Sequence, residues 1–146
     1  MNFQKLFDLE DKVVFITGGG RGIGQSMAKG FSSLGAKISI CDQNKEGIEE
    51  TKSIIVDESS LKTDMVSSVV DVRKKKEIEE AIKLTERNLG PIEIAINCAG
   101  IANANPAEEL SSEQWQTMFD INLTGLFYSC QEEAKVMISR NKGSII

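Results

Sequence analysis

Mostly apolar runs of strand length alternate with helix-compatible segments along almost the whole chain. The runs occupy residues 12–16, 36–41, 65–70, 92–96 and 144–146. A run that is apolar on both faces is typical of a buried strand in a parallel sheet. Strands that alternate regularly with helices indicate that the helices pack on both faces of that sheet. The sequence therefore predicts an α/β fold with a parallel sheet that has helices on both faces.

The first helical segment has apolar side chains at helix spacing, which predicts its buried stripe. These side chains are Ile23, Met27, Phe31 and Leu34. Gly35 is placed to end this helix. Further helices are expected over residues 45–55 and 73–88, and the polar segment 56–64 is interpreted as a surface loop.

A long helix is expected near the end of the chain. Ser111 with Gln114 has the pattern of a capping box, which marks its start. The helical pattern continues to about Arg140, with an interruption near Asn122. Its large apolar side chains are interpreted as core or subunit contacts: Trp115, Met118, Phe119, Leu126 and Met137.

The composition fits one globular domain. The chain has 146 residues, of which 40% are hydrophobic and 27% charged, and its net charge is −5 at pH 7. This acidic balance argues against a nucleic-acid or anionic-membrane partner. Histidine is absent, which excludes histidine-based acid–base chemistry and nearly all catalytic zinc sites. The sequence shows neither a signal segment nor an apolar run of about 18 residues, so we expect a soluble, cytoplasmic protein.

Neither the cysteines nor the acidic residues have the spacing of a metal site. Cys41, Cys98 and Cys130 form no Cys-x-x-Cys pair and are interpreted as reduced, mostly buried thiols. The acidic pairs at 108–109 and 132–133 are interpreted as solvated faces of their segments. We therefore predict no metal centre.

A glycine-rich segment directly follows the first predicted strand and precedes the first helix. It reads Thr17-Gly18-Gly19-Gly20-Arg21-Gly22-Ile23-Gly24, the pattern T-G-x-x-x-G-x-G. A phosphate that approaches backbone amides at the positive end of a helix needs positions without a Cβ. Between a strand and a helix, the segment predicts a phosphate-binding loop; the alternative is a flexible turn without a ligand.

Polar residues also stand at the ends of the next three predicted strands. A carboxylate at Asp42 can accept hydrogen bonds from the ribose hydroxyls of an adenosine and would repel a 2′-phosphate, or it can cap the following helix. Asp71-Val72 and Asn97-Cys98-Ala99-Gly100 follow the third and fourth strands. Because the carboxyl ends of parallel strands meet at one edge of a sheet, we expect all these groups to line one crevice.

These motifs, with Asn122-Leu123-Thr124-Gly125 further on, resemble the classical short-chain dehydrogenase/reductase family. The resemblance covers residues 11–146, and Cys98 takes the second place of the usual Asn-Asn-Ala-Gly motif. It implies a Rossmann-like doubly wound parallel sheet that is truncated here in or just after its fifth strand. It also implies an enzyme that moves a hydride between NAD(P) and a secondary alcohol or ketone. A likeness of residues 102–110 to sugar-alcohol members favours a polyol or sugar as the substrate.

The resemblance also implies a role for each matching residue. The pyrophosphate and adenosine side of the cofactor would be contacted by Gly18, Arg21, Gly22, Ile23 and Gly24. Asp42 would take the ribose hydroxyls, which favours NAD over NADP, although an Arg at the position of Arg21 can reach a 2′-phosphate. The adenine would lie against Asp71 and Val72. The nicotinamide-side ribose would lie against Asn97, Ala99 and Gly100. Asn122 matches the active-site Asn that orders a water in the proton relay.

The acid–base groups of the family have no counterpart among these residues. Members use a Ser on the fifth strand and a Tyr-x-x-x-Lys on the next helix. Here the single tyrosine is Tyr128, with Glu132 rather than a Lys four residues later, and it is interpreted as a partly buried helix residue. Ser144 stands too early in its strand. We therefore expect residues 1–146 to be one dinucleotide-binding domain whose C-terminal catalytic part is missing. The whole chain would be roughly 100 residues longer, and this part alone would be inactive.

Two other classes of protein stay open at this point. One is a non-catalytic dinucleotide-binding or interaction protein that genuinely ends at Ile146. The other is a methyltransferase fold that binds an adenosyl cofactor through its glycine loop, against which Asn97-x-Ala-Gly and Asn122 argue. The family resemblance implies a small-molecule partner and a homodimer or homotetramer in which the helix over 112–140 forms one interface.

Overall fold

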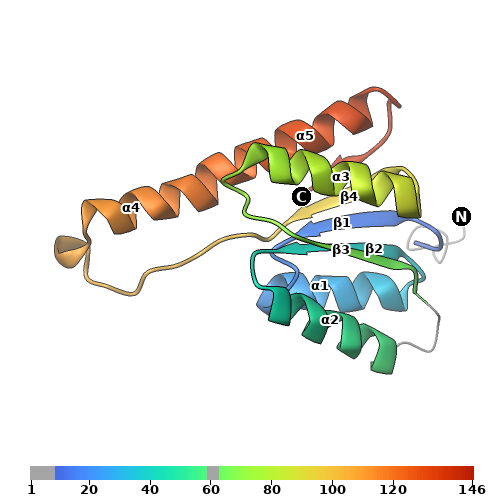
Figure 1. Ribbon diagram of the computed structural model, residues 1–146, viewed down its shortest axis with the longest axis horizontal. Helices are drawn as coiled ribbons and strands as arrows, with labels where there is room; N and C mark the ends of the chain where they lie inside the picture. The colour runs from blue at the N-terminus through green and yellow to red at the C-terminus, as the bar shows by residue number, and fades with distance from the viewer. Residues whose placement is uncertain (1–8, 59–62) are drawn as a thin grey trace, which may run out of the picture.

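The computed structural model describes residues 9–58 and 63–146. Its five strands form one parallel sheet with helices on both faces (Figure 1), which confirms the predicted Rossmann-like α/β fold. The strands are β1 (Val13–Thr17), β2 (Lys37–Asp42), β3 (Met65–Val69), β4 (Ile92–Asn97) and β5 (Ser144–Ile145). The helices are α1 (Gly22–Ser33), α2 (Lys45–Glu58), α3 (Lys75–Leu89), α4 (Ser112–Phe119) and α5 (Leu126–Ile138). A 3-10 turn, η2 (Ala107–Glu109), precedes α4, and a π-helical segment, η3 (Asp120–Gly125), joins α4 to α5.

The order of the strands, β3-β2-β1-β4-β5, fixes where a ligand can enter. The chain winds outward from β1 through β2 to β3 and then returns to the other side of β1 to form β4. Thr17, at the end of β1, is in register with Cys41 of β2 and with Asn97 of β4. The connections that follow β1 and β4 therefore lead to opposite sides of the sheet. Open parallel sheets bind ligands at such a switch point.

Two apolar cores lie on the two faces of the sheet, because successive residues of a strand point to opposite sides. Figure 1 shows α3 and α5 over one face, and α1 and α2 over the other. Phe15 belongs to the core on the α3–α5 side, and Val14 and Ile16 belong to the core on the α1–α2 side. All of β1 is buried, as expected for a central strand.

The buried face of α1 differs from the predicted one. Ile23, Met27 and Leu34 are 72%, 40% and 50% exposed, and only Phe31 of the predicted stripe packs against the core. The face that meets the sheet consists of small residues, namely Gly24, Ala28 and Ser32. Small side chains bring the helix axis close to the sheet, so the larger apolar side chains remain outside.

The predicted ends of the helices are mostly confirmed. Gly35, at φ +84°, follows the end of α1. The capping box before α4 is present, because Ser111 Oγ accepts a hydrogen bond from the Gln114 amide at 3.2 Å while Gln114 Oε1 accepts one from the Ser111 amide at 3.0 Å. The interruption near Asn122 is the segment η3. The loop expected over 56–64 is wrong for residues 56–58, which extend α2, and residues 59–62 lie outside the described residues.

The acidic pair 132–133 is buried, which contradicts its interpretation as a solvated face. Glu132 is 5% exposed and forms ion pairs with Lys75 at 3.3 Å and with Lys135 at 2.8 Å. Glu133 is 0% exposed and faces the sheet. The helix face that carries these carboxyl groups therefore packs on α3 and β4 rather than on solvent.

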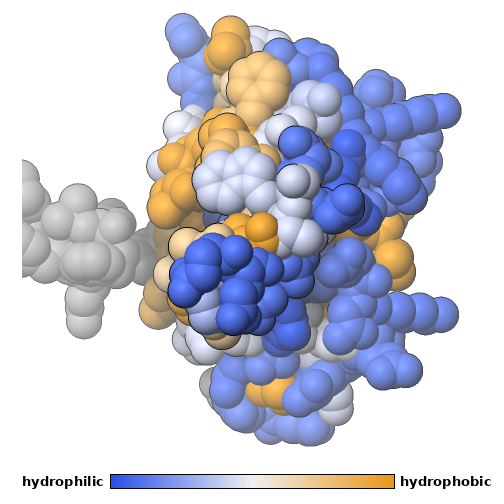
Figure 2. Space-filling view, turned by 90° about the vertical axis from the view of Figure 1, so that its left-hand side faces the viewer, coloured by the Kyte–Doolittle hydropathy of each residue, from blue (hydrophilic) through white to orange (hydrophobic). Residues whose placement is uncertain are grey.

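Three apolar side chains expected as core or subunit contacts are exposed: Trp115, Phe119 and Leu126. Met137 lies in the core as predicted. Figure 2 views the molecule from the α4 side and shows apolar surface gathered along one flank and hydrophilic surface along the other. The three cysteines are free, with Cys41 buried and the other two half-buried. Among the described residues, no helix is both long and apolar enough to span a membrane.

Candidate functional site

A cleft of about 290 Å³ lies at the carboxyl edge of the sheet, above the switch point between β1 and β4. It brings together every residue predicted to contact the cofactor except Asn97. The predicted residues that line it are Gly18, Arg21, Gly22, Ile23, Gly24, Asp42, Asp71, Val72, Ala99 and Gly100. The lining residues that were not predicted to contact the cofactor are Cys41, Gln43, Val70, Cys98, Ile101 and Ile121.

Close backbone contacts shape one wall of the cleft and explain two of its glycines. Gly18 has φ +69°, and a Cβ on it would lie 2.6 Å from the backbone nitrogen of Ala99. A Cβ on Gly24 would lie 2.1 Å from the carbonyl oxygen of Gly18. These contacts hold the loop between β1 and α1 against both its own helix and the segment after β4.

The start of α1 presents backbone amides to the cleft. Arg21 is the N-cap residue, and its side chain makes no cap hydrogen bond within the described chain. Gln25 is the first residue whose amide bonds back, to the Arg21 carbonyl oxygen at 3.3 Å. Gly22, Ile23 and Gly24 line the cleft. First-turn amides at the positive end of a helix attract anions, so this wall fits a phosphate group.

Asp42 anchors the glycine loop to the end of β2. Its Oδ2 accepts a hydrogen bond from the Gly20 amide at 3.0 Å, and its Oδ1 accepts one from the Asn44 amide at 2.9 Å. Asn44, rather than Asp42, caps α2, since its Oδ1 accepts from the Glu46 amide at 3.1 Å. A carboxylate offers about four acceptor positions, so Asp42 keeps capacity for two hydroxyl donors.

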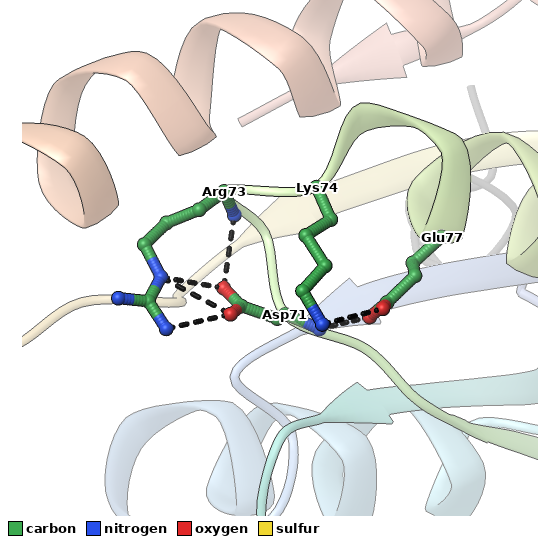
Figure 3. A network of polar contacts seen from close by, with 4 residues as sticks. All are labelled: Asp71, Arg73, Lys74 and Glu77. Carbon is green, nitrogen blue, oxygen red and sulfur yellow. Dashed lines mark hydrogen bonds and ion pairs between the residues drawn. The ribbon is translucent and has the colours of Figure 1, made fainter.

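Asp71 carries an ion pair at the mouth of the cleft. Figure 3 shows the Arg73 guanidinium lying against the Asp71 carboxylate, with Nη2 at 2.6 Å and Nε at 2.9 Å from its oxygens. The Arg73 amide also donates to Asp71 Oδ1 at 3.1 Å. These hydrogen bonds hold the pKa of Asp71 below its usual value. Glu77 accepts from the Asp71 amide at 2.8 Å, which fixes the backbone of the turn before α3.

The side chain of Asn122 binds the segment that follows β4 through two hydrogen bonds. Its Oδ1 accepts from the Ile101 amide at 2.9 Å, and its Nδ2 donates to the Ile101 carbonyl oxygen at 2.8 Å. The π-helical segment η3 also packs closely on the cleft floor, because a Cβ on Gly125 would lie 2.6 Å from Val72 Cγ2. Asn122 does not line the cleft itself, but it positions Ile101, which does.

The side chain of Asn97 points away from the cleft and toward α5. Its Nδ2 donates to Glu133 Oε2 at 2.9 Å, and its Oδ1 accepts from Thr17 Oγ1 at 3.2 Å. Burial raises the pKa of Glu133 to about 7, although the hydrogen bond from Asn97 opposes that shift. Glu133 was not among the predicted site residues. Its position four residues before the core residue Met137 is a signal of burial on one helix face.

The site as a whole fits a dinucleotide. The open amides of α1 can bind a pyrophosphate, Asp42 can accept ribose hydroxyls, and the apolar floor with Val72 and Ile121 can take a ring system. No cluster of three or more His, Cys, Asp or Glu side chains able to hold a metal occurs within residues 9–58 and 63–146.

Comparison with known proteins agrees with this geometry. The chain is 36% identical over 141 residues to 2,3-dihydro-2,3-dihydroxybenzoate dehydrogenase of Bacillus subtilis, covering 94% of this chain and 52% of that protein. It is 33% identical over 140 residues to D-threitol dehydrogenase of Mycolicibacterium smegmatis, covering 96% and 53%. A crystal structure of a short-chain type dehydrogenase/reductase from Mycobacterium marinum superposes with a TM-score of 0.91 at 26% identity, covering 99% and 58%.

The chain spans about half the length of the curated relatives it matches. A family model described as short chain dehydrogenase matches residues 12–146, a range that includes the glycine loop, every strand and the Asn122 segment. This match, together with the parallel sheet and the cleft at its switch point, shows that the chain belongs to the short-chain dehydrogenase family.

Proposed function

We propose that this chain is the cofactor-binding part of an NAD-dependent oxidoreductase that moves a hydride between nicotinamide and a secondary alcohol or ketone. The proposal rests mainly on one observation. The first-turn backbone amides of α1 and the Asp42 carboxylate line the same cleft. Family membership supports the reaction class. A non-catalytic dinucleotide-binding protein would share the cleft but would turn over no alcohol.

Different residues of the cleft would bind different parts of the dinucleotide. Gly18, Arg21, Gly22, Ile23 and Gly24 would hold the pyrophosphate and the adenosine side. Asp42 would hold the adenosine ribose, and the Asp71 turn with Val72 would hold the adenine. Ala99 and Gly100 would contact the nicotinamide-side ribose, and Asn97 would support that wall from behind. The bound dinucleotide would supply the hydride acceptor or donor.

Asn122 is proposed as the one catalytic position present in these residues. Its two hydrogen bonds to Ile101 use one proton of Nδ2 and one lone pair of Oδ1. The second Nδ2 proton and the second Oδ1 lone pair therefore remain for a water molecule. Tyr128 is half-buried on α5 and packs against the core, and the centroid of its ring lies 5.8 Å from Lys75 Nζ. This position supports a structural role.

We also propose the finer assignments that the family relation favours. The substrate is a polyol or sugar, as the similarity to D-threitol dehydrogenase supports. Residues 1–146 act as one dinucleotide-binding domain in the cytoplasm, where free cysteines such as these stay reduced. The α4–α5 face forms an interface in a homodimer or homotetramer, because Trp115, Leu123 and Phe127 are more than half exposed on it.

The test is an assay of the protein expressed from its complete coding sequence. NAD binding is measured by calorimetry, and NADH formation is followed with a panel of polyols and simple secondary alcohols. We expect binding and turnover with at least one polyol, and residues 1–146 alone to show no turnover. Binding without turnover of any alcohol by the complete protein would favour the non-catalytic alternative.

The preference between the two dinucleotides provides a sharper prediction. Asp42 places a negative charge where a 2′-phosphate would lie, so NAD should bind more tightly than NADP by about 2–3 kcal/mol, which is roughly 30- to 150-fold. Asp42→Ala should narrow this gap, because it removes both the repulsion and the ribose hydrogen bonds. Titration of both variants with both dinucleotides measures it. Tighter binding of NADP by the wild type, through Arg21, would show the prediction to be wrong.

A further inference from the structure

A fully buried carboxyl group lies behind the wall of the cleft. Glu133 is 0% exposed, and no cation forms an ion pair with it in the part of the chain that the structure describes. Its Oε1, and the Oγ of Ser129 one turn earlier on α5, are buried without a hydrogen-bond partner among the described residues. A carboxylate buried without a cation costs stability.

A chain of hydrogen bonds leads from Glu133 to the cleft. Glu133 Oε2 accepts from Asn97 Nδ2 at 2.9 Å, and Asn97 Oδ1 accepts from Thr17 Oγ1 at 3.2 Å. Thr17 Oγ1 in turn accepts from the Ala99 amide at 3.4 Å. Ala99 lines the cleft, and its nitrogen occupies the space that a side chain on Gly18 would need. The chain therefore ends where the glycine loop and the segment after β4 meet.

The protonation state of Glu133 determines the donor and the acceptor in each hydrogen bond that Asn97 makes. An ionised carboxylate only accepts hydrogen bonds, so it requires the NH₂ group of Asn97 and turns Asn97 Oδ1 toward Thr17. The Thr17 hydroxyl then donates to Asn97 and keeps its lone pairs for the Ala99 amide. A protonated carboxyl group can donate, which permits the reversed amide of Asn97. In that arrangement Asn97 Nδ2 donates to Thr17 Oγ1, which must then accept from both Asn97 and the Ala99 amide, and the Thr17 hydroxyl proton loses Asn97 Oδ1 as its acceptor.

The surroundings of Glu133 leave it as the group that titrates near neutral pH. Asn97 faces it from β4 and is neutral. The Cys41 thiol from β2 and the Cys130 thiol from α5 interact with it electrostatically. Burial raises the pKa of Cys41 to about 12 and also raises the pKa of Cys130, so both thiols stay neutral. Burial raises the pKa of Glu133 to about 7.

We propose that Glu133 is a positioning residue for the cleft, whose ionised carboxylate holds the Asn97–Thr17–Ala99 chain in the orientation that binds the dinucleotide. This inference rests on the proposed function, because it concerns affinity for the same ligand. Uptake of a proton by Glu133 allows the side-chain amide of Asn97 to reverse, and this weakens the hydrogen bond from the Ala99 amide to Thr17. The dissociation constant for the dinucleotide then rises by about fivefold, the equivalent of one neutral hydrogen bond.

The experiment compares binding with the state of the carboxyl group. NAD affinity of the complete protein is measured by calorimetry from about pH 5.5 to about pH 8.5, and the side-chain carboxyl resonance of Glu133 is followed by ¹³C NMR over the same range. We expect the wild-type dissociation constant to rise about fivefold as the resonance reports protonation. Glu133→Gln is expected to bind with an affinity that does not change with pH.

Glu132→Gln is the matched control. It removes a neighbouring buried carboxylate whose partners, Lys75 and Lys135, take no part in the hydrogen bonds that join Glu133 to the cleft. It should keep the wild-type pH profile of binding, whatever it does to stability. A profile abolished equally by Glu132→Gln would assign the effect to loss of any buried charge on α5 and overturn the inference.

The wild-type protein alone can also overturn the inference, independently of whether a variant folds. An affinity that stays constant while the Glu133 resonance titrates near pH 7 would exclude the positioning role and leave the proposed function intact. Absence of NAD binding at every pH would instead refute the proposed function, and the inference with it.

Discussion

Gly24→Ala is expected to destabilise the protein by about 3 kcal/mol and to abolish dinucleotide binding. The added Cβ would lie 2.1 Å from the carbonyl oxygen and 2.7 Å from the carbonyl carbon of Gly18. Both atoms belong to the backbone, so relief requires α1 to move away from the loop that its first turn completes. Denaturant unfolding and NAD titration measure the two effects.

Gly30→Ala is the control for this prediction because it lies on the same helix. Within the described structure, no atom outside its own helix lies within 4 Å of a Cβ built there. Alanine is the better helix former, so this variant should be stabilised by about 0.5–1 kcal/mol with unchanged NAD affinity. If Gly24→Ala behaved like Gly30→Ala, the close approach of α1 to the glycine loop would not be essential.

Glu133→Gln is expected to be more stable than the wild type above pH 7, by up to about 3 kcal/mol, and equally stable near pH 4.5. The pKa of Glu133 rises from its ordinary value of 4.5 to about 7 in the folded protein. Between these values the folded state holds a proton that the unfolded state has released, so wild-type stability falls as the pH rises. Glutamine carries no charge and avoids this loss. Urea unfolding at several pH values measures it.

Glu132→Gln should respond in the opposite direction. Although burial opposes the shift, hydrogen bonds and charge interactions with Lys135 and Lys75 lower the pKa of Glu132 below its usual value. Its ionised form therefore stabilises the fold above its ordinary pKa, and this contribution disappears as the pH falls through its lowered pKa. The glutamine variant should lose stability at neutral pH. A Glu133→Gln variant that is less stable than the wild type at pH 8 would contradict the assignment of a charged, unpaired carboxylate.

The predictability of the fold depends on how much of the information is local. The mostly apolar runs of β1, β2 and β4 can be recognised without knowledge of distant residues, because strands covered on both faces are rich in apolar residues. The buried side of α1 could not be predicted in that way. Large side chains dominate any apolar periodicity, whereas the contact with the sheet uses Gly24, Ala28 and Ser32 because they are small.

The site shows the same division. The glycine loop and Asp42 carry their chemistry in residue type and position, and the structure brings them to the cleft. Glu133 and Arg73 act through partners on other segments or across a turn, which the identity of the residue alone does not reveal. An acidic residue on a helix is normally exposed, and only its placement opposite β4 makes Glu133 a buried neighbour of Asn97.

The central place of β1 has a consequence for how the protein is made. Its partner β2 follows after one helix, but its other partner β4 is distant, with Thr17 and Asn97 separated by 80 positions. A growing polypeptide therefore leaves one edge of β1, a strand that is fully buried in the folded protein, unpaired on the ribosome until β4 emerges. The wall between Gly18 and Ala99 closes only after that delay. This connectivity favours slow folding and leaves the unpaired edge open to aggregation during translation.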